Sequence, residues 1–269
     1  MLQSVLPREI RNMVYAHIFN TMDAFDFLGT ASTLNPSYVN GVHENDGTIA
    51  RNGWPRIIDP KVVHPNFARE LIETFYHGYK DFAVLDARKI DEMLQTDHFD
   101  LEIWPGDCMI SALAVCVRFT GNYDGSWNTK DGSNLLPACV DPRKARFVQP
   151  NDIATCFAPL LSDRQRLTPG FKLTIYLHTE WRPRHWHDSV HNIQERAYRS
   201  SMEDVTKALA ATLQACRPVV CQMKHRRNAN VKVVVGMGEK AEMVMKEGDM
   251  GMSADDWLER FEADPRFAW

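Results

Sequence analysis

Segments of helical periodicity alternate with short apolar runs along most of this 269-residue chain. Apolar residues recur at helical spacing in the ranges 7–18, 62–76, 90–94, 152–161, 188–217 and 253–261. Strands are predicted in the apolar or alternating runs 81–85, 113–119, 171–177 and 231–235. This alternation favours a single sheet with covering helices, in the α/β or α+β class, over a helical bundle or a β-sandwich.

Local signals predict where several of these elements begin and end. The range 188–217 contains neither glycine nor proline, and Pro218 follows it at a usual stop position for a helix. Polar residues alternate with apolar ones in 171–177, so we expect one face of that strand to be wet. Ser253 is a good N-cap for the last helix, because acidic residues follow in its first turn.

Composition indicates a soluble protein that stays inside the cell. No run approaches the roughly 18 consecutive apolar residues of a membrane helix, and the N-terminus has no apolar signal-peptide core, so we expect no membrane partner and no export. The cysteines form no CxxC pair and are expected to be buried free thiols: Cys108, Cys116, Cys139, Cys156, Cys216 and Cys221. Such thiols indicate a reducing compartment, and we predict a cytoplasmic or nuclear location.

Charge is small overall but unevenly distributed. The formal net charge is -4, which provides no global field to attract nucleic acid, so we do not expect a nucleic-acid partner. Residues 224–227 form a compact basic run, whereas residues 236–269 hold nine acidic and four basic side chains. Two interpretations stay open for these runs, namely a solvated surface or an electrostatic docking surface.

A histidine cluster between the third and fourth predicted strands is the strongest indication of metal chemistry. His187 and His191 stand four residues apart, Asp188 follows the first, and His185 lies close by. Two histidines on one helical face beside an acid are typical of zinc hydrolases. However, Asp188 is also a good N-cap, which would place His187 outside the helix and spoil this geometry. We therefore treat the histidines as weak metal candidates and expect packing or hydrogen bonding as their usual role.

A glycine motif after the last predicted strand resembles a dinucleotide fingerprint. Residues 233–241 fit a strand followed by G-x-G-x-x-A. That fingerprint needs a following helix and a further parallel strand, and only 28 residues remain, so a simple turn explains the glycines better. The chain also lacks a phosphate loop and a nucleophile elbow. We expect no cofactor, no catalytic residues and no enzymatic activity.

The N-terminus carries a family resemblance. Residues 6–15, which read Leu-Pro-Arg-Glu-Ile-Arg-Asn-Met-Val-Tyr, resemble the opening of fungal F-box-like proteins. The helix at 62–76 that ends in Phe-Tyr, and the segments 81–85, 90–99 and 113–119, are similar to that family's elements in the same order. This divides the chain into an F-box-like helix at 1–20, a turn-rich linker or loop at 21–63, and an α/β body at 64–269.

The resemblance implies a protein-recruiting adaptor. It implies that the first helix, packed on or beside the sheet, docks into the SKP-type adaptor of a cullin–RING ubiquitin ligase, while the body holds a protein substrate of unknown identity. The partner-binding residues would be Leu6, Pro7, Ile10, Val14 and Ile18. Three alternatives stay open: the same helical face packs against its own chain, the chain is a ligase-independent interaction or scaffold protein, or it is a metal-dependent hydrolase at the histidine cluster.

Overall fold

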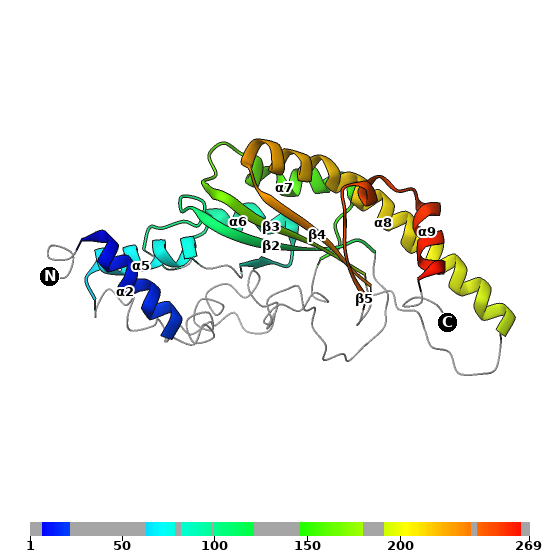
Figure 1. The fold of residues 1–269 in the computed structure, drawn as a ribbon, viewed down its shortest axis with the longest axis horizontal. Helices are drawn as coiled ribbons and strands as arrows, with labels where there is room; N and C mark the ends of the chain where they lie inside the picture. Colours follow the sequence, from blue (N-terminus) through cyan, green and yellow to red (C-terminus); the bar gives the residue numbers. More distant parts are fainter. Residues whose placement is uncertain are drawn as a thin grey trace.

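A computed structural model of the chain contains one five-stranded sheet within the part that it describes. The described residues are 7–21, 63–78, 82–97, 99, 101–120, 146–179, 191–237 and 241–264. The strands follow one another across the sheet in chain order as β1 (Ala83–Val84), β2 (Ile110–Arg118), β3 (Leu167–Thr179), β4 (Asn230–Met237) and β5 (Ala241–Val244). The predicted single sheet with covering helices is confirmed (Figure 1).

The first four strands are parallel, and β5 pairs antiparallel with β4 at the edge. The helical connections between the parallel strands are η1 (Ala87–Lys89) with α6 (Ile90–Gln95), η3 (Pro150–Asp152) with α7 (Ile153–Leu161), and α8 (His191–Arg227). Figure 1 shows α6, α7 and α8 on one side of the sheet. Parallel strands that follow one another in chain order, joined by crossovers of one hand, place their helices on the same face.

Both faces of the central strands are buried. Val115, Ile175 and Val233 are aligned across β2, β3 and β4 and belong to the main core with the helices. On the opposite face, Cys116 and Tyr176 belong to a second buried cluster. The prediction that one face of β3 is exposed to water is therefore wrong for the second half of this strand, because strands in the middle of a parallel sheet are covered on both sides.

Helix α8 runs ten residues past its expected end, because Pro218 lies inside the helix and not beyond it. The proline removes one backbone hydrogen-bond donor. Burial of Val219, Val220 and Met223 in the core stabilises the helix beyond this position. The helix ends at Arg227, and Asn228 follows with a positive φ of 49°. An asparagine tolerates this left-handed conformation better than most residues, which lets the chain turn back into β4.

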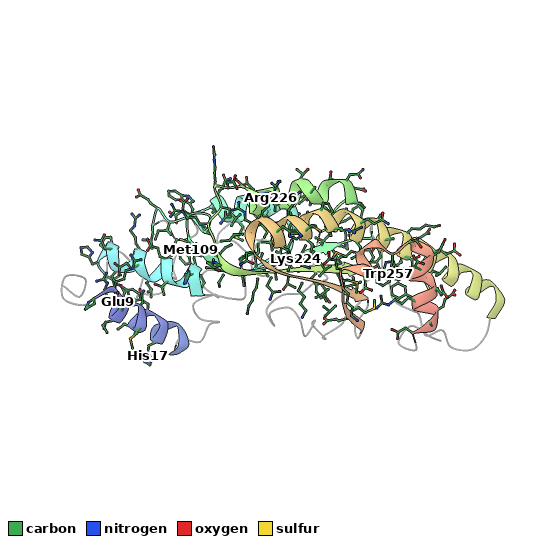
Figure 2. The ribbon with its side chains drawn as sticks, turned by 45° about the horizontal axis from the view of Figure 1, so that its top comes forward. Glu9, His17, Met109, Lys224, Arg226 and Trp257 are labelled. Carbon is green, nitrogen blue, oxygen red and sulfur yellow. The ribbon has the colours of Figure 1, made fainter. Side chains whose placement is uncertain are left out.

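The C-terminal helix α9 (Ala254–Ala263) begins where the sequence predicted. The Ser253 side chain accepts a hydrogen bond from the Asp256 backbone N–H at 3.1 Å, and the Asp256 carboxylate accepts one from the Ser253 N–H at 2.8 Å. Trp257 and Phe261 are fully buried, and α9 contacts α8. Figure 2 labels Trp257 on α9. Just before α9, the chain forms the short helix η4 (Gly248–Gly251), which also contacts α8.

The described cysteines are mostly enclosed by the core. Four are buried, as expected, namely Cys108, Cys116, Cys156 and Cys216. Cys221 is half-buried instead of buried, and Cys139 lies outside the described residues. Burial raises the pKa of Cys116 and of Cys216 to about 12, which keeps both thiols protonated. Within the described ranges, no helix combines the length and the apolar character needed to cross a membrane.

Candidate partner-binding surface on the N-terminal helix

The N-terminal helix α2 (Arg8–Thr21) lies across α5 (Pro65–Gly78), which in turn contacts β2. The helix starts where the sequence predicted, since Pro7 precedes it and the Arg11 N–H donates to the Pro7 carbonyl oxygen at 3.1 Å. Proline suits this position, because the first turn of a helix has no internal acceptor for its N–H.

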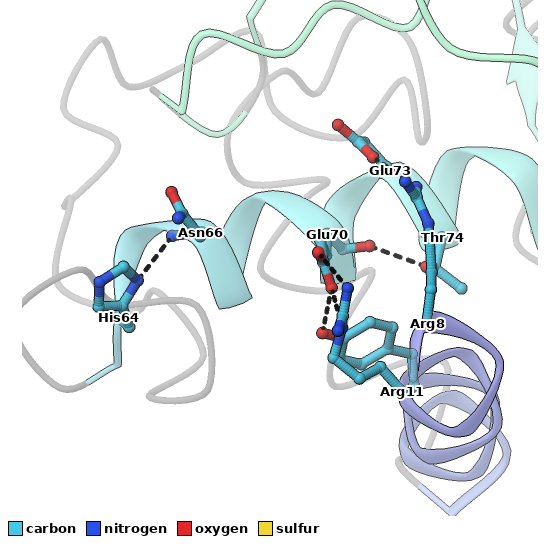
Figure 3. Close-up of polar contacts among 8 residues, drawn as sticks. Arg8, Arg11, His64, Asn66, Glu70, Glu73 and Thr74 are labelled. Atoms are coloured by element: carbon cyan, nitrogen blue, oxygen red, sulfur yellow. Dashed lines mark hydrogen bonds and ion pairs between the residues drawn. The ribbon is translucent and has the colours of Figure 1, made fainter. Parts of the chain in front are cut away.

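Polar side chains make the contact between the two helices. The Arg11 guanidinium donates from Nε and Nη2 to the two carboxylate oxygens of Glu70, at 2.8 and 3.0 Å. The Tyr15 hydroxyl donates to Glu70 Oε2 at 2.8 Å, and Arg8 forms an outer ion pair with Glu73 at 3.3 Å. Figure 3 shows both arginines reaching from α2 toward the carboxylates of α5. A bidentate arginine contact fixes orientation as well as distance, so these residues hold α2 at one angle on α5.

The surroundings of this contact keep Glu70 charged. Tyr15 is buried, with its ring edge-on to Phe67 at a centroid distance of 5.4 Å. Burial, followed by the hydrogen bond to Glu70, raises the pKa of Tyr15 to about 12. Partial burial of Glu70 acts to raise its pKa, but the hydrogen bonds from Arg11 and Tyr15 together lower it below the ordinary value. The carboxylate therefore stays ionised and bonded to both donors at neutral pH.

The side of α2 that faces away from α5 is apolar and exposed. Ile10 and Val14 are each 43% exposed, and Met13 is 68% exposed. At 100° per residue these three side chains fall within about one third of the helix circumference, and we call them the α2 ridge. The exposed His17 continues the ridge by one turn, and Figure 2 shows it pointing away from α5.

The predicted partner-binding residues divide between this ridge and parts of the chain that are not described. Ile10 and Val14 lie on the ridge, and Pro7 is exposed at the start of the helix. Leu6 and the side chain of Ile18 lie outside the described residues. The helical face turned toward α5 carries Arg11 and Tyr15 instead of Ile10 and Val14.

Sequence reasoning missed Met13, although it is the most exposed member of the ridge. The predicted stripe runs through Ile10, Val14 and Ile18 at positions i, i+4 and i+8 and omits the neighbour at i+3. Positions i+3 and i+4 are equally close to position i on a helix surface, so the signal was present in the sequence.

The histidine cluster falls mainly outside the described residues. His185 and His187 lie outside them, and His191 is the first residue of α8, where the side chain is not described. Among the residues that the structure describes, no group of three or more histidine, cysteine, aspartate or glutamate side chains is arranged to hold a metal ion.

The glycine motif has a structural explanation other than the expected turn. Gly236 lies inside β4, and the antiparallel strand β5 is the next described element, where a dinucleotide fingerprint requires a helix. A Cβ atom on Gly236 would lie 2.2 Å from the hydroxyl oxygen of Tyr176, which donates a hydrogen bond to Glu242 at 3.1 Å. The turn interpretation is wrong for Gly236, because the glycine makes room for the tyrosine ring.

No family model, curated protein or solved structure matches this chain.

Proposed function

We propose that this chain is a non-enzymatic protein-interaction adaptor whose α2 ridge docks into the SKP-type adaptor of a cullin–RING ubiquitin ligase. The α/β body would then hold the protein substrate, in the cytoplasm or nucleus. One observation carries the proposal: Ile10, Met13 and Val14 are exposed on a helix whose opposite face is held by Glu70. The resemblance of residues 6–15 to fungal F-box-like proteins selects the partner.

An exposed apolar ridge on a fixed helix suits recognition in a hydrophobic groove. Such recognition uses anchors at i, i+3 and i+4, which is the spacing of Ile10, Met13 and Val14. Because Arg11 and Tyr15 already hold α2 on α5, binding does not have to order this helix, and less conformational entropy is lost. The ridge is accessible without separating the two helices.

The apolar area of the ridge limits the binding free energy that it can contribute. Full burial of one large apolar side chain contributes about 1.5–3 kcal/mol. Ile10 and Val14 are already about half covered in the free protein, so we expect about 1 kcal/mol from each of them and somewhat more from Met13. Together the three side chains would supply about 3–4 kcal/mol, or roughly 150- to 700-fold in affinity. Further contacts outside the ridge are needed for a stable complex.

Co-expression of the tagged chain with an SKP-type adaptor tests the proposal. We expect the two proteins to elute as one complex from a sizing column. Val14→Asp should weaken this complex at least tenfold, because a carboxylate would be buried in an apolar groove without a partner. Asn12→Asp is the matched control, since it adds the same charge at an exposed position about 160° around the same helix.

Thermal unfolding of the same samples checks that both variants are folded. Both substituted positions are exposed, so neither variant should unfold at a lower temperature than the unmodified chain. A complex that tolerates Val14→Asp as well as Asn12→Asp would contradict the assignment of the ridge. Failure of the unmodified chain to bind the adaptor would contradict the link to a ubiquitin ligase.

A further inference from the structure

Several elements carry basic residues near the edge of the sheet where β3 and β4 begin. The last turn of α8 is tied to the loop after α7, because the Arg227 guanidinium donates to the carbonyl oxygens of Leu161, at 3.0 Å, and Ser162. The parallel register then places Asn230, at the start of β4, beside Lys172 of β3. Three parts of the chain that are distant in sequence therefore share this edge.

Each of these parts contributes cations. The loop after α7 carries two exposed arginines, the last turn of α8 carries Lys224 and Arg226, and the two strands carry one lysine each. A further lysine follows β5, where the Met245 N–H donates to the Val233 carbonyl oxygen at 2.8 Å and brings the next residue beside β4. We call this set the basic edge: Arg164, Arg166, Lys172, Lys224, Arg226, Lys232 and Lys246. Figure 2 labels Lys224 and Arg226 at the end of α8.

Few carboxylates offset this charge. Among the described residues, Glu247 lies 3.7 Å from Lys224 and Asp163 lies 3.7 Å from Arg227. The Asp249 carboxylate accepts a hydrogen bond from the backbone N–H of Lys246 at 2.8 Å, and Asp107 lies in the turn that precedes β2. With Arg227 included, this region holds eight cations and four carboxylates, a net charge of +4, whereas the remainder of the chain carries -8.

A helix dipole explains only part of this distribution. Cations are favoured in the last turn of a helix, which accounts for Lys224 and Arg226. The dipole acts only over that turn, and it does not account for Lys172 and Lys232 on the strands or for Arg166 before β3. A surface that merely needs to stay soluble would intersperse both signs of charge.

We propose that the basic edge binds a short acidic segment of a partner protein. Val244, which is 50% exposed, is aligned with Val234 on the sheet face that also carries Lys232, so the edge borders an apolar contact point. Cations beside one exposed apolar side chain fit an acidic peptide that includes an apolar residue.

A nucleic-acid strand fits this edge less well. Non-specific strands need successive aromatic side chains on which bases stack, and Trp104, in the turn before β2, is the one large aromatic that is exposed among the described residues. A long polyanion would also extend beyond the edge and meet the acidic remainder of the chain, including α9. A short acidic segment avoids this repulsion.

Fluorescence anisotropy with the full chain tests the proposal. The probe is a labelled peptide of about twelve residues, rich in Asp and Glu with one Leu, which spans roughly 40 Å when extended. The double variant Arg166→Glu with Arg226→Glu should bind this peptide about tenfold more weakly, because two attractive charges become repulsive. Higher salt should weaken binding further, since these side chains are exposed.

The double variant Lys89→Glu with Lys207→Glu is the matched control. It changes the net charge by the same amount, at side chains that are 45% and 65% exposed. Lys207 lies on α8 itself, about 25 Å before Lys224 at 1.5 Å per residue. We expect less than a twofold change from this control and none from Val14→Asp on the α2 ridge, so the proposal is tested separately from the proposed function.

Three results would overturn the proposal. An equal loss of binding in both double variants would mean that net charge alone attracts the peptide. Absence of saturable binding by the unmodified chain would mean that the edge is only a solvated surface. Tighter binding of labelled oligothymidine than of the peptide would assign the edge to nucleic acid.

Discussion

Replacement of Gly236 by alanine should destabilise the sheet, because the added methyl group meets the ring of Tyr176. The new Cβ would lie 2.2 Å from the tyrosine hydroxyl oxygen, 2.7 Å from Cζ and 3.1 Å from Cε1. Tyr176 is 2% exposed, stacks on His178 and donates to Glu242, so the ring has little freedom to move aside.

The expected loss of stability has two parts. Overpacking of a filled site costs about 1–3 kcal/mol, and a lost hydrogen bond to a charged acceptor costs about 1.5–3 kcal/mol. Glu242 is only half-buried, so the lower end of the second range applies. We therefore expect Gly236→Ala to lower the free energy of unfolding by about 3 kcal/mol.

Urea denaturation of a double-mutant cycle with Tyr176→Phe measures this effect. Phenylalanine removes the atom that makes the 2.2 Å contact and also removes the hydrogen bond to Glu242. Since both single variants lose that same bond, the double variant should be more stable than the sum of the single effects predicts, by about 1 kcal/mol or more.

Gly248→Ala is the matched control, because nothing lies within 4 Å of a Cβ atom at that position. We expect it to change stability by no more than about 1 kcal/mol. If Gly236→Ala unfolds at the same urea concentration as the unmodified chain, or if the two effects in the cycle simply add, the close approach of Tyr176 does not explain this glycine.

Two further predictions concern the helix start at α9 and the contact between α2 and α5. Ser253→Ala should lower the free energy of unfolding by about 1 kcal/mol in urea denaturation, because the capping box with Asp256 is lost; an unchanged midpoint would contradict a contribution from the cap. The folded-state pKa of Glu70 lies below its ordinary value of 4.5, so its contribution is fully present above that pH and is lost as the pH falls through the lowered pKa. The stability difference between the unmodified chain and Glu70→Gln should therefore be largest near neutral pH and shrink in acid. A difference that grows on acidification would refute this direction of the pH dependence.

Elements with strong local signals were predicted well. The last helix begins at Ser253 as predicted, because an N-cap and the acidic first turn act within four residues. The strand β4 was predicted from a run of β-branched valines, which favour extended backbone. These signals are local, so they can be interpreted without knowing what packs against the element.

Predictions that depended on tertiary contacts were wrong. Pro218 was expected to lie beyond the end of α8, but burial of Val219 and Val220 sustains the helix through the proline. The second half of β3 was expected to have a wet face, yet Tyr176 is buried there. The short strand β5 was missed, since four residues after a glycine motif carry little pattern of their own.

Each of the two proposed binding surfaces was visible in the sequence only in part, because its assembly depends on contacts between residues far apart in the chain. Apolar spacing indicated Ile10 and Val14, but the choice of the face that remains exposed depends on Glu70, which is 59 positions from Arg11. The basic run in α8 was visible in the sequence, whereas its union with Lys172 depends on the register of β3 and β4.

The amino-acid sequence by itself determined most of the segments that become helices or strands, and hence the α/β class, because periodicity and caps act over a few residues. The tertiary structure decided strand order, the burial of both sheet faces, the exposure of the α2 ridge and the assembly of the basic edge. These features come from contacts between residues far apart in the chain, where packing and electrostatic pairing select one arrangement among many that the local pattern allows.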